Sequence, residues 1–246
     1  MVFTIGSTRA TRRQRTGVRT ATRAAALPGG RTGTRRRTHL ALCALVAEYT
    51  ARCGWAVVPG VRAGRDGACS CGDRACKEPG RHPVDPEVEV PAGAGLRQAA
   101  EVWERMPGAS VLLPVGRAFD VIDVAEAPGR LALARLERMG LHLGPVLLTP
   151  AGRAQFFVAP GAAVELPYLL YRMGWDDARL DLRCLGRGDH VAAPPSEVAG
   201  LGPVRWLREP FLDAVPPPPE ARLLLGTLAY VSHRDHRDRQ RERAFV

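Results

Sequence analysis

The sequence predicts a mixed α/β (α+β) domain over residues 38–212. Helical and strand-like segments follow one another along this stretch, and short turns at Gly116 and Gly152 join neighbouring strand candidates. Hairpins of this kind favour a mixed sheet over a regular parallel βαβ array. The composition, 46% hydrophobic and 24% charged, is that of an ordinary globular chain.

The individual elements follow from the spacing of apolar residues. Thr38 suits the N-cap of a first helix, in which Leu42 and Val46 recur at helical intervals and which Gly54 ends. Similar spacing predicts three further helices, at 96–106, 129–139 and 166–173. Short apolar runs bounded by turn residues predict strands at 55–59, 111–115, 119–124, 145–148, 154–158, 180–184, 190–193 and 204–207.

The two ends of the chain differ from the domain in composition. Residues 1–37 are rich in Arg, Thr, Gly and Ala with few large apolar side chains, which predicts a disordered basic tail. This tail either binds nucleic acid as an arm or has no role. Residues 213–219 form a Pro-rich linker, and residues 220–246 are expected to hold a C-terminal helix and a charged tail.

The positive charge of the chain is concentrated in these tails. The formal net charge is +10, but residues 1–38 alone contribute +10 and residues 220–246 contribute +2, which leaves −2 on residues 39–219. Strong, salt-sensitive attraction to phosphate is therefore expected mainly from the ends of the chain. The folded part is not a basic platform for nucleic acid.

The sequence has no apolar run of the length that a membrane-spanning helix requires. The basic N-terminus also lacks the apolar stretch of a secretory signal. We therefore expect a cytoplasmic protein without a membrane partner. In that compartment cysteines stay reduced and are available as metal ligands.

A loop at residues 67–83 carries the sharpest chemical signal. Cys69, Cys71, Cys76 and His82 lie within fourteen residues, and Cys₃His is a common ligand set for structural zinc. The loop has few large apolar residues, so a bound metal would be its main source of order. Four protein ligands would close the coordination shell and make the site structural rather than catalytic. The alternative is a flexible loop with free thiols.

Several motifs in sequence order resemble the N-terminal prim-pol domain of bifunctional DNA primase/polymerases, within the archaeo-eukaryotic primase superfamily. Each motif is weak alone, but together they cover about 170 residues. They are Gly54-Trp55 with Pro59, Pro79-Gly80-Arg81-His82-Pro83, Trp103, Asp123-Val124-Ala125, Ala151-Gly152-Arg153-Ala154-Gln155, Asp181-Leu182-Arg183 and Pro194-Pro195-Ser196.

The resemblance implies a metal-dependent nucleotidyltransferase that acts on single-stranded DNA and nucleotides. In such an enzyme, carboxylates hold Mg²⁺ or Mn²⁺ for in-line displacement at a triphosphate. The corresponding carboxylates here are Asp123 and Asp181, the candidate catalytic residues. Gln155, Arg153 and Arg183 are the candidate substrate-binding residues, because they can donate hydrogen bonds to phosphate.

Two positions depart from the family pattern. Ala125 replaces the second carboxylate of the Asp-x-Asp motif, and Gln155 replaces a histidine and can neither carry charge nor shuttle a proton. Two alternatives follow: an altered enzyme that works with Asp123 and Asp181, or a non-catalytic module that binds nucleic acid or protein. The loss of a metal ligand favours weakened or lost catalysis.

The sequence contains no G-x-x-x-x-G-K-[ST] motif, so the chain is not expected to unwind DNA by itself. If the domain primes, it needs a strand opened by another protein. We therefore expect a helicase or another replication protein as a partner in trans.

Overall fold

The computed structural model describes residues 30–64, 66–198, 201–210 and 216–244. The predicted disorder of residues 1–29 therefore lies outside the described residues. Five helices are found in this part of the chain: α1 (Gly30–Ala51), α2 (Leu96–Arg105), α3 (Glu126–Arg138), α4 (Ala162–Arg172) and α5 (Ala221–Ala244). The strands are β1 (Val58–Gly60), β2 (Ser110–Pro114), β3 (Asp120–Ala125), β4 (Val146–Thr149), β5 (Arg153–Val158), β6 (Leu182–Leu185), β7 (His190–Ala193), β8 (Glu197–Val198), β9 (Gly202–Pro203) and β10 (Arg205–Arg208).

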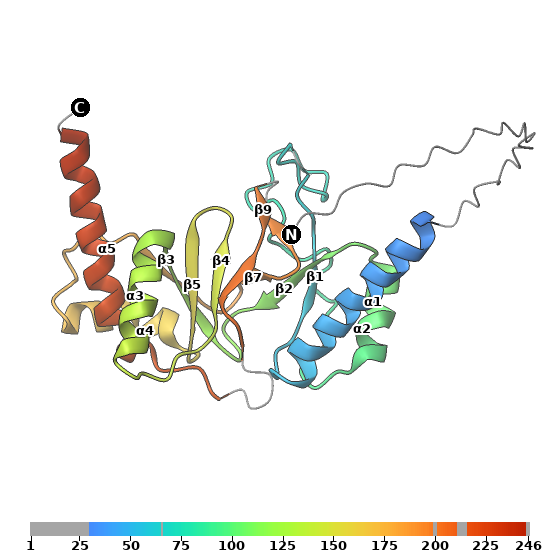
Figure 1. The fold of residues 1–246 in the computed structure, drawn as a ribbon, viewed down its shortest axis with the longest axis horizontal. Coiled ribbons are helices and arrows are strands. Elements are labelled where there is room, and N and C mark those ends of the chain that lie inside the picture. Colours follow the sequence, from blue (N-terminus) through green and yellow to red (C-terminus); the bar gives the residue numbers. More distant parts are fainter. Residues whose placement is uncertain (1–29, 65, 199–200, 211–215, 245–246) are drawn as a thin grey trace, which may run out of the picture.

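The strands form antiparallel sheets of different sizes. The largest has the order β10-β4-β5-β3-β6, a second has the order β1-β2-β7, and β8 pairs with β9. In Figure 1, α1 and α2 flank the three-stranded sheet, whereas α3, α4 and α5 gather beside the five-stranded one. Strands and helices thus share one mixed architecture, and the predicted fold class is confirmed.

The five-stranded sheet is buried on both faces. Ile122, Val124 and Phe156 face the cluster formed with α3 and α5, whereas Val121 and Phe157 pack in the cluster that also contains α1, α2 and the three-stranded sheet. Because side chains alternate along a strand, Asp123 and Gln155 lie on the same face as Val121 and Phe157. The polar residues of β3 and β5 therefore face the side of the three-stranded sheet.

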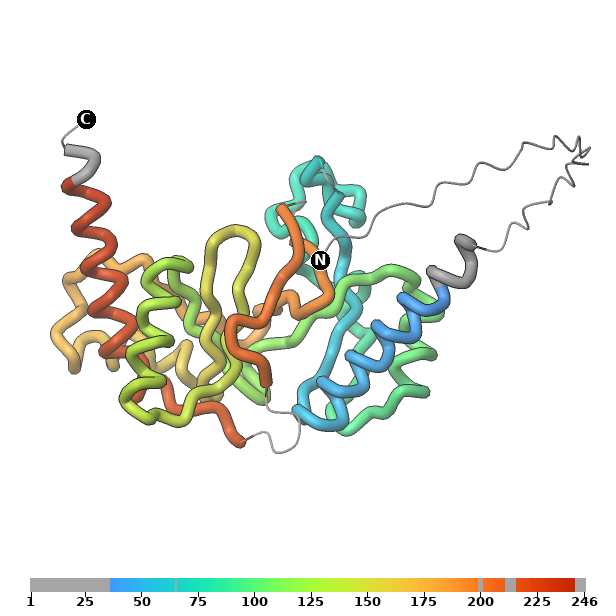
Figure 2. The backbone as a smooth tube through the Cα atoms, in the orientation of Figure 1, coloured from blue at the N-terminus to red at the C-terminus, as the bar shows by residue number. Residues whose placement is uncertain are grey.

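Both terminal helices are longer than the sequence predicts. The first helix begins at Gly30 rather than at Thr38, so the expected boundary is wrong. α5 continues to Ala244, through residues that we expected to form a charged tail. Arginine is a good helix former, and ion pairs such as Arg234–Asp238 support an exposed helix, although neither feature gives an amphipathic pattern. Figure 2 shows the outer half of α5 projecting from the domain.

Among the described helices, only α1 and α5 are long enough to be considered as membrane-spanning segments. Both have negative mean hydropathy, as expected from their arginines. Within the described part of the chain, no helix combines the length and apolar character needed to cross a bilayer.

Candidate functional site

The site is built around β3, which lies between β5 and β6 in the sheet. The register places Asp123 opposite Gln155 on β5 and opposite Arg183 on β6. Arg153 stands opposite Ala125, one step further along the same face. The pairing therefore brings all three predicted substrate-binding side chains around one carboxylate.

Asp123 is completely buried, and both of its carboxylate oxygens accept hydrogen bonds. Oδ1 accepts from Nε of Arg153 at 2.7 Å and from Nε of Arg183 at 3.4 Å. Oδ2 accepts from Nε2 of Gln155 at 2.9 Å. A buried carboxylate requires such partners because its desolvation is costly.

Arg153 joins the two candidate catalytic carboxylates. While Nε binds Asp123, Nη1 donates to Oδ1 of Asp181 at 2.6 Å. Burial by itself would lower the pKa of Arg153, but hydrogen bonds and charge from Asp181 and Asp123 raise it on balance. Asp181 lies just before β6, and Arg239 of α5 approaches its other oxygen at 3.8 Å. The guanidinium of Arg153 thus lies between both carboxylates.

This cluster opens into a cavity of about 140 Å³ between the two larger sheets. The five-stranded sheet contributes Asp123, Arg153, Gln155 and Arg183 to its lining, and Asp189 and His190 line it from the start of β7 in the three-stranded sheet. The Cys/His loop adds Glu78 and Arg81. Burial lowers the pKa of His190, which favours its neutral imidazole.

Two other acidic residues near the motif face elsewhere. Asp120 points away from Asp123, as strand alternation predicts, and its Oδ2 accepts from the backbone N–H groups of Gly161 and Ala163 at the start of α4. Glu126 is the first residue of α3 and pairs with Arg130 at 2.8 Å. Neither supplies the carboxylate that is missing at Ala125.

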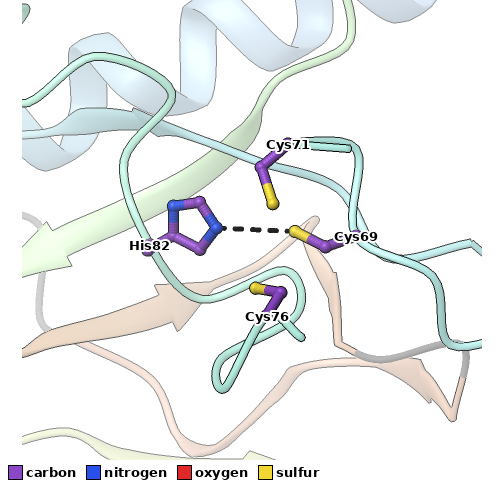
Figure 3. Close-up of side chains that lie close together, drawn as sticks. All are labelled: Cys69, Cys71, Cys76 and His82. Carbon is purple, nitrogen blue, oxygen red and sulfur yellow. Dashed lines mark hydrogen bonds between the residues drawn. The ribbon is translucent and has the colours of Figure 1, made fainter. Parts of the chain in front are cut away.

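The four predicted metal ligands converge at one point of the loop (Figure 3). Their donor atoms all lie within 4.8 Å of one another, and Sγ of Cys69 lies 3.5 Å from Nε2 of His82. The edge of a tetrahedral zinc site with one sulfur and one nitrogen is also about 3.5 Å, given bond lengths of about 2.3 and 2.0 Å. The cluster could hold a metal ion.

Neighbouring groups favour the metal-binding forms of two of these donors, His82 and Cys69. Nδ1 of His82 lies 3.0 Å from the carbonyl oxygen of Pro83, and a proton on Nδ1 leaves Nε2 with its lone pair facing the cysteines. Partial burial raises the pKa of the Cys69 thiol, but hydrogen bonds from the backbone at Cys71 and Gly80 and from neighbouring side chains bring it down to about 6. A thiolate is therefore accessible at neutral pH at Cys69, whereas desolvation and the neighbouring Cys69 and Cys71 raise the pKa of Cys76 to about 11.

The sequence of the chain matches the family described as bifunctional DNA primase/polymerase, N-terminal, over residues 46–221. The chain belongs to this family. The match spans most of the described domain and includes the Cys/His loop and every motif residue discussed above. No curated protein and no solved structure matches the chain. Family membership supports a primase/polymerase-type domain and implies binding of nucleotides and nucleic acid.

We predicted Asp123, Arg153, Gln155 and Arg183 of this cavity from the sequence. We did not predict Arg81 and His190, which line the same cavity, or Arg239, which approaches Asp181. Arg81 lies in the Pro-Gly-Arg-His-Pro motif, in which we predicted a role, as a metal ligand, only for its neighbour His82. His190, the first residue of β7, lines the cavity together with Arg81. Arg239 comes from α5, and no motif marks it. The motif position of Arg81 was the one available signal.

Proposed function

We propose that this Prim-Pol domain binds nucleotides and single-stranded nucleic acid but has lost nucleotidyl transfer. The observation that carries the proposal is the guanidinium of Arg153 between Asp123 and Asp181, at 2.7 and 2.6 Å. In the catalytic members of the family, this is where divalent metal would be expected. Here a cation of the protein itself neutralises both carboxylates.

The residues at this position do not fit a pair of divalent metal ions. Mg²⁺ demands near-octahedral oxygen ligands, whereas both oxygens of Asp123 already accept hydrogen bonds from Arg153, Arg183 and Gln155. Ala125 offers no ligand. A metal ion would also be repelled by the guanidinium groups at this site. We therefore assign Asp123 and Asp181 an electrostatic role: they hold the arginines in place.

The pocket suits the phosphate end of a nucleotide. Its volume of about 140 Å³ is below the roughly 300 Å³ typical of pockets that enclose a whole ligand. Arg183 is more than half exposed and presents further N–H groups to the cavity, and it shares Oδ1 of Asp123 with Arg153. Guanidinium groups bind phosphate oxygens in a planar, two-point geometry. The base and sugar would then lie outside the cavity.

We further propose that the ion in the Cys/His cluster is zinc and that the site is structural. Three thiols and one imidazole form a soft donor set that favours zinc over Mg²⁺ or Ca²⁺. Four protein ligands leave no open position for catalysis. Cysteines that are reduced and free to bind metal are expected in the cytoplasm, where we propose that the protein resides.

The decisive assay is template-dependent incorporation of labelled nucleotides by the full-length protein, with Mg²⁺ or Mn²⁺, on primed and unprimed single strands. The blank is Asp123→Ala/Asp181→Ala. We expect the wild type to incorporate no more than this variant, while calorimetry shows that the wild type binds dATP. Incorporation that disappears in the variant would establish an active enzyme instead. A helicase or replication protein acting in trans is the partner class to test next, since a non-catalytic domain needs one to affect DNA.

A further inference from the structure

Arg81 differs from the other arginines that line the pocket. It is half-buried and lines the cavity from the Cys/His loop rather than from the five-stranded sheet. Arg153 and Arg183 both donate to Asp123, but Arg81 has no ion pair with any described carboxylate. A partly buried guanidinium without a counter-ion is a strong site for an anion, because its charge is less screened by water.

The backbone on both sides of Arg81 is tied to the metal cluster. The next residue, His82, supplies one of the four donor atoms, and the preceding residue, Gly80, is buried with a φ of +75°. The N–H of Arg81 donates to the carbonyl of Glu78 at 3.0 Å, which closes a tight turn. The orientation of Arg81 toward the cavity therefore depends on where this turn is held.

The loop has few other anchors between Cys69 and His82. Its C-terminal end is held beside β1, where N–H of Val61 donates to the carbonyl of His82 and N–H of Val84 donates to that of Pro59. At its N-terminal end, N–H of Ser70 donates to the carbonyl of Arg62 at 2.8 Å. Between these ends the residues are mostly exposed and polar. A metal ion bound by four side chains is the strongest interaction available to fix such a segment.

We propose that Arg81 contacts the phosphate chain of the bound nucleotide, and that the metal ion held by Cys69, Cys71, Cys76 and His82 positions it. This proposal rests on the nucleotide-binding function proposed above. The metal then acts on ligand affinity without touching the ligand. The pocket closes around phosphate from two sides: Arg183 from β6 and Arg81 from the loop.

The test measures binding of inorganic tripolyphosphate and of dATP by calorimetry, without added divalent metal, in four proteins. These are the wild type, Arg81→Ala, Arg81→Lys and Arg74→Ala, which removes an exposed arginine of the same loop that does not line the cavity. We expect Arg81→Ala to weaken binding roughly tenfold, as for loss of a charged hydrogen bond. Arg81→Lys should be intermediate, and Arg74→Ala should match the wild type.

The second arm removes the metal with a chelator and restores it with zinc. Removal should weaken binding to the wild type roughly tenfold but leave Arg81→Ala unchanged, because one interaction cannot be lost twice. Equal losses in both proteins, or Arg81→Ala binding like Arg74→Ala, would overturn the assignment. No binding to the wild type would instead refute the proposed function itself. Thermal unfolding and zinc content, measured on every sample, separate lost binding from lost structure.

Discussion

Nε of Arg153 donates to Oδ1 of Asp123 across 2.7 Å, and the carboxylate of Asp123 has no exposed surface. A buried charge of this kind is stable only with its partner. Removing one member of a buried pair costs about 3 kcal/mol or more, because the other is left uncompensated. The pair therefore stabilises the five-stranded sheet and also lines the pocket.

The first prediction concerns this pair. Arg153→Ala should lower the free energy of unfolding by about 3 kcal/mol, measured by urea denaturation at neutral pH. Combining it with Asp123→Asn should recover part of the loss, since the buried charge is then gone. The control is Arg130→Ala, which breaks an exposed pair with Glu126 and should change stability by less than about 0.5 kcal/mol. Equal effects of Arg153→Ala and Arg130→Ala would contradict this account.

The second prediction concerns metal content. The purified full-length protein should carry one zinc ion per chain by elemental mass spectrometry, and Cys71→Ser should lose it, because a three-ligand site binds far more weakly. Cys184→Ser is the matched control: this thiol lies on β6, outside the ligand cluster. A wild type without zinc would refute the metal site, as would a Cys71→Ser protein that keeps it.

The third prediction concerns the packing of α3 on the sheet behind the site. A Cβ atom on Gly129 would lie 2.5 Å from Cβ of Ala154, so the helix could not keep its present distance from β5. Gly129→Ala should therefore destabilise the protein by about 1–3 kcal/mol, although alanine is the better helix former. The control is Gly226→Ala inside α5, where the added atom would meet only Sδ of Met173 at 4.0 Å, so that alanine should stabilise the protein by up to about 1 kcal/mol. A gain in stability for Gly129→Ala would show that the contact is looser than the structure indicates.

The fourth prediction concerns pH. Burial lowers the pKa of His190 below its ordinary 6.5, although Asp189 and Glu78 partly oppose the shift. As pH falls, His190 therefore takes up a proton in the unfolded chain before it does so in the folded protein. The free energy of unfolding contributed by neutral His190 is complete above about pH 6.5 and decreases below it. The wild type should lose more unfolding free energy than His190→Asn between about pH 7.5 and about pH 5.5. Parallel curves for the two proteins would exclude this contribution.

Much of the site follows from local sequence, because strand alternation and motif order place Asp123, Gln155 and Arg183 on one face. The Cys/His cluster was also predictable, since its ligands are close in the sequence. The contacts of Arg153 with Asp123 and Asp181 were not, because they depend on pairing across the sheet, which sets Arg153 opposite Ala125 and within reach of both carboxylates. Phosphate binding by Arg153 stays a prediction. The part of the lining that comes from the Cys/His loop and from β7 depends on tertiary packing, which no local sequence pattern encodes.

The ends of the helices were the least predictable part of the fold. Hydrophobic periodicity locates a helix by its buried face, and the outer turns of α1 and α5 are mainly polar or charged. Their helical structure depends on propensity and on pairs such as Arg234–Asp238, which leave no apolar pattern. Arg239 was missed for this reason, although it approaches Asp181.

The central claim is that Arg153 excludes divalent metal from Asp123 and Asp181. Its most direct test is binding of Mn²⁺ to zinc-loaded full-length protein, followed by electron paramagnetic resonance. We predict no Mn²⁺ site that depends on Asp123, so the wild type and Asp123→Asn should give the same free-ion signal. Arg153→Gln, which removes the cation, is the variant in which Mn²⁺ binding should first emerge. Tight Mn²⁺ binding to the wild type that Asp123→Asn abolishes would contradict the account and return the domain to the catalytic members of its family.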